Sequence, residues 1–120
     1  MIITQFTIPF ELCDLNTYIN AERTNRFKAA KIKKEQTESI AWITKQLTKV
    51  DVPFKLKVVW YVKNKKKDPD NVAFAKKFIL DGMKEGGMIE NDGMAQVVGF
   101  EDVFIVTSEP KVTVFLYSNE

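Results

Sequence analysis

The clearest strand signal lies at residues 54–62, where the sequence is FKLKVVWYV. Apolar Leu56, Val58 and Trp60 alternate there with lysines and a tyrosine, the two-residue period of a strand with one buried face. We therefore take this segment as the central strand of a sheet and assign the rest of the chain around it.

Helical periodicity precedes this strand. Apolar residues recur at helical spacing from Ile32 to Val50, which predicts one long helix over about residues 22–50. Residues 9–21 hold several turn-forming side chains and are expected to be irregular. Residues 2–8 are expected to form a short strand.

A second helix and two more strands are predicted after the central strand. The expected elements are a helix over about residues 72–84 that stops at Gly86-Gly87, and strands over 96–107 and 111–117 joined as a hairpin through Glu109-Pro110. The order β-α-β-α-β-β, without a linker or repeat, predicts one domain over residues 1–120. Its class is α+β or α/β, with a mixed sheet of about four strands and two main helices.

The composition restricts the chemistry. The chain has no histidine and a single cysteine, Cys13. Histidine-based nucleophilic mechanisms, histidine-ligated zinc and disulfide frameworks are thereby excluded. Carboxylates, lysines, hydroxyls or a hard metal ion remain. Because the first residues lack a basic leader and no apolar run approaches the ~20 residues of a membrane helix, we expect a cytoplasmic protein that does not enter a membrane.

The net charge of +2 hides a strong division along the chain. Residues 1–67 hold 14 Lys/Arg against 6 Asp/Glu, whereas residues 68–120 hold 4 against 10. A basic half suits a polyanionic partner and an acidic half suits metal binding, although charges of this kind also serve only to solvate a surface. The basic residues available to a polyanionic partner such as DNA are Arg23, Arg26, Lys28, Lys31, Lys34, Lys65, Lys66, Lys67 and Lys76.

The acidic half opens with Asp68-Pro69-Asp70-Asn71. Proline suits the second position of a type I turn, and Asp or Asn caps a following helix, so capping alone would account for these residues. An EF-hand calcium loop is excluded, because Val72 stands where an oxygen ligand is needed.

Helical geometry gives the motif a second interpretation. At 100° per residue, a helix that begins near Asp70 places Lys77 and Asp81 on the same face, although an ordinary ion pair would also explain the spacing of Lys77 and Asp81. Asp92 follows in Asn91-Asp92-Gly93, an ordinary turn sequence. If the second helix lies back across the sheet, we expect Asp92 to join Asp68 and Asp70.

Taken together, these segments resemble the RusA-type Holliday-junction resolvases, a family common in bacteriophages and prophages. The resemblance covers most of the chain and rests on the basic run ending in Asp68-x-Asp70-Asn71, on Lys77-x-x-x-Asp81-Gly82, on Gly86-Gly87-Met88-Ile89-Glu90-Asn91-Asp92-Gly93, and on the opening Leu15-Asn16-x-Tyr18. It implies a RusA-like fold and a phage or prophage origin.

The resemblance also implies an activity. In that family three aspartates bind magnesium, and they match Asp68, Asp70 and Asp92 here, while a lysine of the helix acts in catalysis. The implied protein is a homodimeric, Mg²⁺-dependent endodeoxyribonuclease that resolves four-way DNA junctions by paired symmetric nicks during recombination and repair. Whether Mn²⁺ replaces Mg²⁺ stays open.

Two departures from the family pattern affect the assignment. The stretch between Asn71 and the lysine is about one helical turn longer than in the best-studied branch, so Lys76 and Lys77 are both eligible. We choose Lys77, because it keeps the four-residue step to Asp81. Asn91 stands where some relatives have a second acid, and we expect Asn71, Asp81 and Asn91 to support the ligands rather than to bind metal.

Two other functions compete with the nuclease. A non-catalytic branched-DNA-binding protein derived from the same family would keep the basic surface without turnover. A structural or interaction protein would use the acidic motif only to cap a helix. The three aspartates favour the nuclease, because a DNA-binding protein gains nothing from carboxylates that face phosphate.

Overall fold

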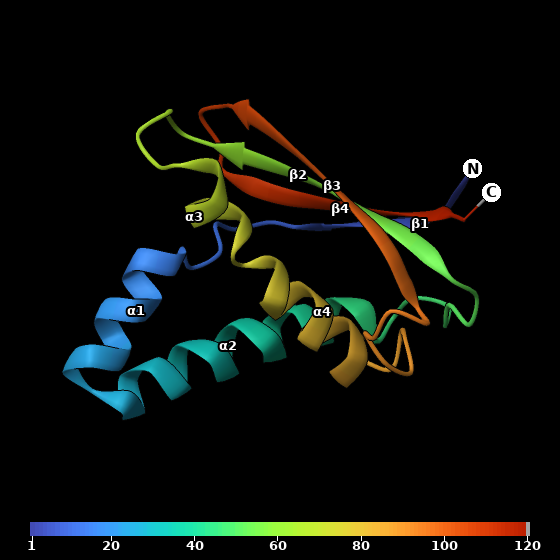
Figure 1. Cartoon of the computed structure of the whole chain (residues 1–120), viewed down its shortest axis with the longest axis horizontal. Helices are drawn as coiled ribbons and strands as arrows, with labels where there is room; N and C mark the ends of the chain where they lie inside the picture. The colour runs from blue at the N-terminus through green and yellow to red at the C-terminus, as the bar shows by residue number, and fades with distance from the viewer. Residues whose placement is uncertain (120) are drawn as a thin grey trace.

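Four strands form one mixed sheet in the order β1-β4-β2-β3 (Figure 1). They are β1 (Ile2–Ile8), β2 (Phe54–Val62), β3 (Val97–Val106) and β4 (Lys111–Ser118). β2 pairs in parallel with β3 and antiparallel with β4, and β4 pairs antiparallel with β1. The computed structural model, which describes residues 1–119, thus confirms the predicted α+β class, the mixed sheet and the element order.

The helices lie on one face of the sheet (Figure 1). They are α1 (Leu15–Thr24), α2 (Arg26–Thr44), α3 (Pro69–Ala73) and α4 (Lys76–Glu85). No helix in residues 1–119 has the length and apolar character needed to cross a membrane.

The prediction of one helix over residues 22–50 was wrong, as was that of an irregular segment at 9–21. The Oδ1 atom of Asp14 accepts the Thr17 backbone N–H at 2.8 Å, so a helix starts at residue 15. The side chain of Asn25 accepts the Phe27 N–H at 2.9 Å and starts a second helix. Each cap satisfies backbone donors that the first turn leaves without partners, and the extended backbone of Asn25 separates the two helices.

The second predicted helix is also divided. α3 begins with Pro69 at its first helical position, where the missing N–H costs nothing. A turn at Phe74 and Ala75 then separates α3 from α4. The rotation of 100° per residue cannot be counted through this turn, so the predicted common face of Asp70, Lys77 and Asp81 loses its geometric basis.

The predicted hairpin between the last two strands was wrong. β3 and β4 are not neighbours, because β2 lies between them. α3 and α4 carry the chain from the end of β2 back to the start of the parallel strand β3, as parallel pairing requires. β4 then takes the remaining edge of β2, antiparallel to it.

The core fills the space between the sheet and the helices. Leu56, Val58 and Trp60 of β2 are buried against Ile40 of α2 and Ile79 of α4. β2 is flanked by strands on both sides and is covered by helices, which explains its strong apolar pattern.

Helices α2 and α4 approach each other through glycine. A Cβ atom at Gly82 would lie 2.5 Å from the Ile40 Cβ, and one at Gly86 would lie 2.2 Å from the Thr44 Oγ1. The Thr44 hydroxyl donates to the Gly82 carbonyl at 3.1 Å. Side chains at these two glycines would therefore force the helices apart.

We expect Gly82→Ala to destabilise the fold by about 1–3 kcal/mol, because overpacking at Ile40 outweighs the better helix propensity of alanine. Urea unfolding measures the change. Gly99→Ala is the control, since its Cβ would lie 3.6 Å from the Lys55 Cγ, an ordinary contact. Equal stability of the two variants would contradict the close packing of α2 and α4.

Candidate functional site

Asp68 and Asp70 lie at the carboxyl end of β2. The loop of residues 63–68 leaves that strand, Asp68 occupies the N-cap position of α3, and Asp70 lies in its first turn. The Asp68 side chain makes no capping hydrogen bond. Both residues are exposed, and neither forms an ion pair within residues 1–119. Two carboxylates are thus free to bind a cation.

Asp92 lies at the opposite end of the sheet. Its neighbour Gly93 accepts the backbone N–H groups of Gln96 and Val97 at 3.0 and 2.9 Å. The Phe54 N–H donates to the Gln96 carbonyl at 2.8 Å, which holds this loop beside the start of β2. β2 has nine residues and spans roughly 26 Å at about 3.3 Å per residue. Figure 1 shows the same separation: α3 and the start of β3 lie at opposite ends of the molecule.

The expected convergence of Asp68, Asp70 and Asp92 therefore does not occur within one chain. Within residues 1–119, no group of three or more Cys, Asp or Glu side chains is placed to hold a metal ion. The reason is the parallel crossover, which leads from the carboxyl ends of the strands to their amino ends. The assignment of each aspartate as a metal ligand remains a prediction.

The two candidate lysines of α4 have different surroundings. The Lys76 Nζ lies 2.6 Å from the Asp102 Oδ2 and 4.3 Å from the centre of the Phe100 ring. The Trp60 Nε1–H donates to the other Asp102 oxygen at 2.8 Å. Lys77 is exposed and forms no ion pair within residues 1–119, so the alternative explanation of its spacing from Asp81, an ordinary ion pair, does not hold there.

The sequence patterns did not identify Asp102 as a residue of this region. It stands between Phe100 and Phe104 at two-residue spacing, so it interrupts an apolar row of a strand. A carboxylate in such a row indicates a polar partner on the neighbouring element, and here the partners are Lys76 and Trp60.

The two asparagines that flank the aspartates shape the backbone. Asn71 is buried, and its Oδ1 accepts the Asn16 backbone N–H at 2.9 Å, which holds the start of α1 against α3. The Asn91 Oδ1 accepts the Asp92 N–H at 3.0 Å. Both residues thus hold the backbone of the segments that carry the aspartates, and their expected support of metal ligands remains a prediction.

The lysine-rich loop is partly neutralised. The Lys67 Nζ lies 2.8 Å from the Asp14 Oδ2 and 3.3 Å from the Glu11 Oε1. Its hydrogen bond to Asp14 raises the pKa of Lys67, although burial opposes the change. Burial raises the pKa of Asp14, but hydrogen bonds from Lys67 and Thr17 outweigh it, so the pKa lies below its usual 3.8.

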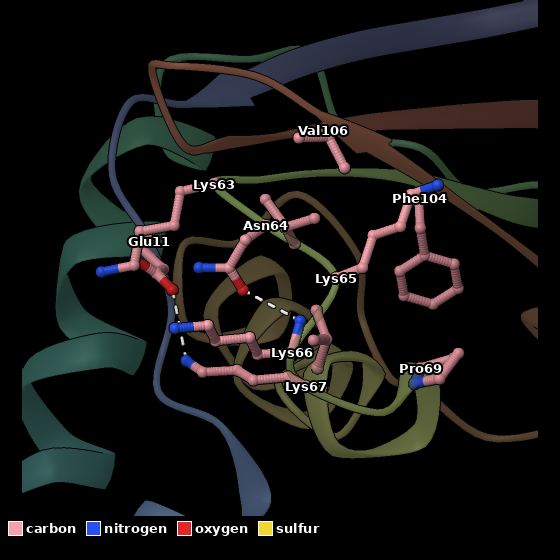
Figure 2. Close-up of a pocket in the computed structure, with 11 residues that line it drawn as sticks. Glu11, Lys63, Asn64, Lys65, Lys66, Lys67, Pro69, Phe104 and Val106 are labelled. Atoms are coloured by element: carbon pink, nitrogen blue, oxygen red, sulfur yellow. Dashed lines mark hydrogen bonds and ion pairs between the residues drawn. The ribbon is translucent and has the colours of Figure 1, made fainter.

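The other lysines of the loop keep their charge available. Lys63, Lys65 and Lys66 are exposed and form no ion pair within the described part of the chain. They line a cavity of about 630 Å³ between the loop and the end of β3 (Figure 2).

A second basic region covers the end of α1 and the first half of α2. α1 and α2 meet at the corner of the molecule farthest from β3 (Figure 1). Five of its exposed residues are the predicted DNA contacts Arg23, Arg26, Lys28, Lys31 and Lys34. Within residues 1–119 only Lys31 of these five has an acidic partner, Glu35, at 3.8 Å, an exposed pair that adds little stability.

No protein-family model matches this chain, and no curated protein matches it either.

Asp14→Ala should lower the free energy of unfolding by about 1–2 kcal/mol near neutral pH, because α1 loses its cap. Asp14→Asn keeps the cap acceptor and should lose less. Since the pKa of Asp14 is lowered by folding, its ionic contribution is present above pH 3.8 and is lost as the pH falls through the lower folded value. Urea unfolding at about pH 7 and pH 3 should therefore show a smaller acid-induced loss for Asp14→Asn than for the parent protein.

Asp102→Ala should destabilise the fold by about 1–3 kcal/mol, because the indole N–H of Trp60 would be buried without an acceptor. Asp102→Asn keeps an oxygen for Trp60 and loses only the charge that Lys76 faces, so its loss should be smaller. Denaturant unfolding distinguishes the two. An equal loss for the two variants would show that the ion pair, not the indole hydrogen bond, dominates.

Proposed function

We propose that the chain is a Mg²⁺-dependent endodeoxyribonuclease that nicks four-way DNA junctions as a homodimer. The observation that carries the proposal is the state of Asp68 and Asp70. Both carboxylates are exposed and have no cationic partner within residues 1–119, although four lysines lie within the five residues before Asp68. The nearest of these lysines, Lys67, pairs instead with Glu11 and Asp14. Such an arrangement leaves hard oxygen ligands beside uncompensated positive charge.

The donor set fits Mg²⁺, which takes one or two carboxylates together with several waters. Asp68 and Asp70 would hold the ion, and when bound it supplies an acidified water and neutralises charge on the phosphate. Lys77 would stabilise the negative charge that builds on the phosphate oxygens, because its ammonium has no acidic partner in residues 1–119.

The basic regions would hold the DNA backbone. The free lysines of the 63–66 loop lie directly before the two aspartates, so a phosphate bound there is close to the metal ligands. Basic residues of α1 and α2 would contact a second arm of the junction. Contacts of this kind depend on the phosphates and not on base sequence, and they weaken as salt rises.

A homodimer would supply the third aspartate. β3 is an edge strand of ten residues, and Val98, Phe100 and Ile105 on it are exposed. An edge of this kind is suited to pairing with a second chain. Antiparallel pairing of β3 with its copy about a two-fold axis would bring the Asp92 end of one chain to the Asp68 end of the other. Two equivalent sites would result, as paired symmetric nicks require.

Three further apolar residues of β3 and β4 are candidates for a dimer surface: Val114 is fully buried and Phe115 is half-buried, while Phe104 is exposed. Val114 is therefore a core residue and not an interface residue.

A non-catalytic branched-DNA-binding protein is the second candidate. The absence of a three-carboxylate group within residues 1–119 favours it, because one chain alone then lacks a complete metal site. Such a protein would bind a four-way junction with a steep salt dependence and would not nick it in Mg²⁺.

We expect the protein to nick a synthetic four-way junction in Mg²⁺, and we expect Asp70→Asn to remove nicking while junction binding persists. Gel assays of nicking and of junction binding measure both. Glu109→Gln is the matched control, because Glu109 is also an exposed carboxylate without an ion pair within residues 1–119 and has no proposed role in the site. Full nicking by Asp70→Asn would refute the proposed metal site at Asp70. Binding without nicking by the parent protein would refute the nuclease assignment and support the second candidate.

The shared site is tested by mixing subunits. Asp70→Asn and Asp92→Asn should each be inactive alone, yet their mixture should regain nicking, because one of the two sites in a mixed dimer receives only unaltered aspartates. If each site were built from one chain, every site in the mixed dimer would lack one aspartate and the mixture would stay inactive.

A further inference from the structure

The cavity beside the lysine-rich loop has two different walls. Val62, Val72, Phe104 and Val106 line one part of it, and the backbone and side chains of residues 63–67 line the other. Figure 2 shows Phe104 and Pro69 on one side of the cavity and Glu11 on the opposite side, with Lys66 and Lys67 between them and the Lys65 side chain extending toward Phe104. Its volume of about 630 Å³ lies in the range of sites that enclose small molecules or single molecular groups.

The apolar wall includes an aromatic ring, that of Phe104, which is not buried in the core. Phe104 is 37% exposed and Val106 is 49% exposed, although both belong to the helix-covered face of the sheet. Phe104 and Val106 pair with Trp60 and Val62 of β2, and residues paired across neighbouring strands point to the same face of the sheet. An exposed ring at the rim of a cavity offers a flat surface against which another flat group can stack.

The polar wall carries uncompensated positive charge. Of its four lysines, only Lys67 has acidic partners, while Lys63, Lys65 and Lys66 have none within residues 1–119. The Asn64 Oδ1 accepts the Lys66 backbone N–H at 2.9 Å, which fixes the turn that presents these lysines. The complementary ligand is therefore a flat, partly apolar group joined to an anion.

We propose that this cavity binds one unpaired nucleotide of the DNA, with the base against Phe104 and the adjoining phosphates on Lys65 and Lys66. A paired base cannot enter, because its faces are covered by its neighbours in the duplex. Stacking on an aromatic side chain combined with lysine contacts to the backbone is how single strands are bound without sequence readout. The inference rests on the proposed function for the identity of the ligand.

The position of the cavity links this binding to the aspartates. Pro69 lines the cavity, and Asp68 and Asp70 flank Pro69 in the chain. A nucleotide held at Phe104 would bring its own phosphodiester to these carboxylates. Binding of an unpaired nucleotide would thus select branched DNA over continuous duplex.

The test compares two fluorescently labelled duplexes of the same length, one with a single unpaired nucleotide and one fully paired. Binding of the whole protein is measured by anisotropy without Mg²⁺, so no cleavage intervenes. The parent protein should bind the first duplex at least about fivefold more tightly, and Phe104→Ala should remove that preference while keeping the affinity for the paired duplex. Trp42→Ala is the matched control, since Trp42 is an aromatic residue that is 63% exposed, does not line this cavity and lies outside the proposed dimer edge.

A double variant, Lys65→Gln with Lys66→Gln, should weaken both duplexes and reduce the salt dependence of binding. Thermal melts establish that each variant is folded. Equal affinity of the parent protein for the two duplexes, or an unchanged preference in Phe104→Ala, would overturn the inference. Nicking of junctions by the parent protein is measured separately, so the nuclease assignment can fail while the cavity preference stands, and the reverse.

Discussion

The parallel pairing of β2 with β3 is the constraint on which the rest of the molecule depends. Two parallel strands cannot be joined by a tight turn, so α3 and α4 must cross the face of the sheet to return the chain to its starting end. The crossover buries the apolar face of β2 and leaves β3 as an edge. The crossover also separates the acidic residues, because Asp68 follows the end of β2 and Asp92 precedes the start of β3 at the other end of the sheet.

The sequence was sufficient for the sheet but not for its pairing. The alternation of Leu56, Val58 and Trp60 identified β2, since a half-covered strand requires that pattern. The alternation does not indicate which strands lie on either side of β2. A hairpin between β3 and β4 was the simplest interpretation. This interpretation gave no sign that Asp92 lies far from Asp70. The position of Asp92 depends on the path that the second helix takes across the sheet.

Local chemistry decided the helix boundaries and explains the other errors. Asp14 and Asn25 each accept a backbone N–H and so begin a helix, an effect that apolar periodicity does not register. The exposed part of the candidate site could be predicted from the sequence. Asp68, Asp70 and the lysine-rich loop lie together because they are consecutive in the chain. Asp102 depended on contacts between distant segments, so its ties to Lys76 and Trp60 appear only in three dimensions.

The contact of α2 with α4 through Gly82 and Gly86 has a mechanical consequence. The two glycines are four residues apart, about one helical turn, and each lies against a side chain of α2 with no Cβ between the helices. A slide of less than about 5 Å would press Ile40 and Thr44 onto the larger residues between the glycines, so intermediate positions are sterically blocked. α2 and α4 therefore move as one body. If the basic end of α2 binds DNA as proposed, α4 keeps a fixed position relative to that DNA.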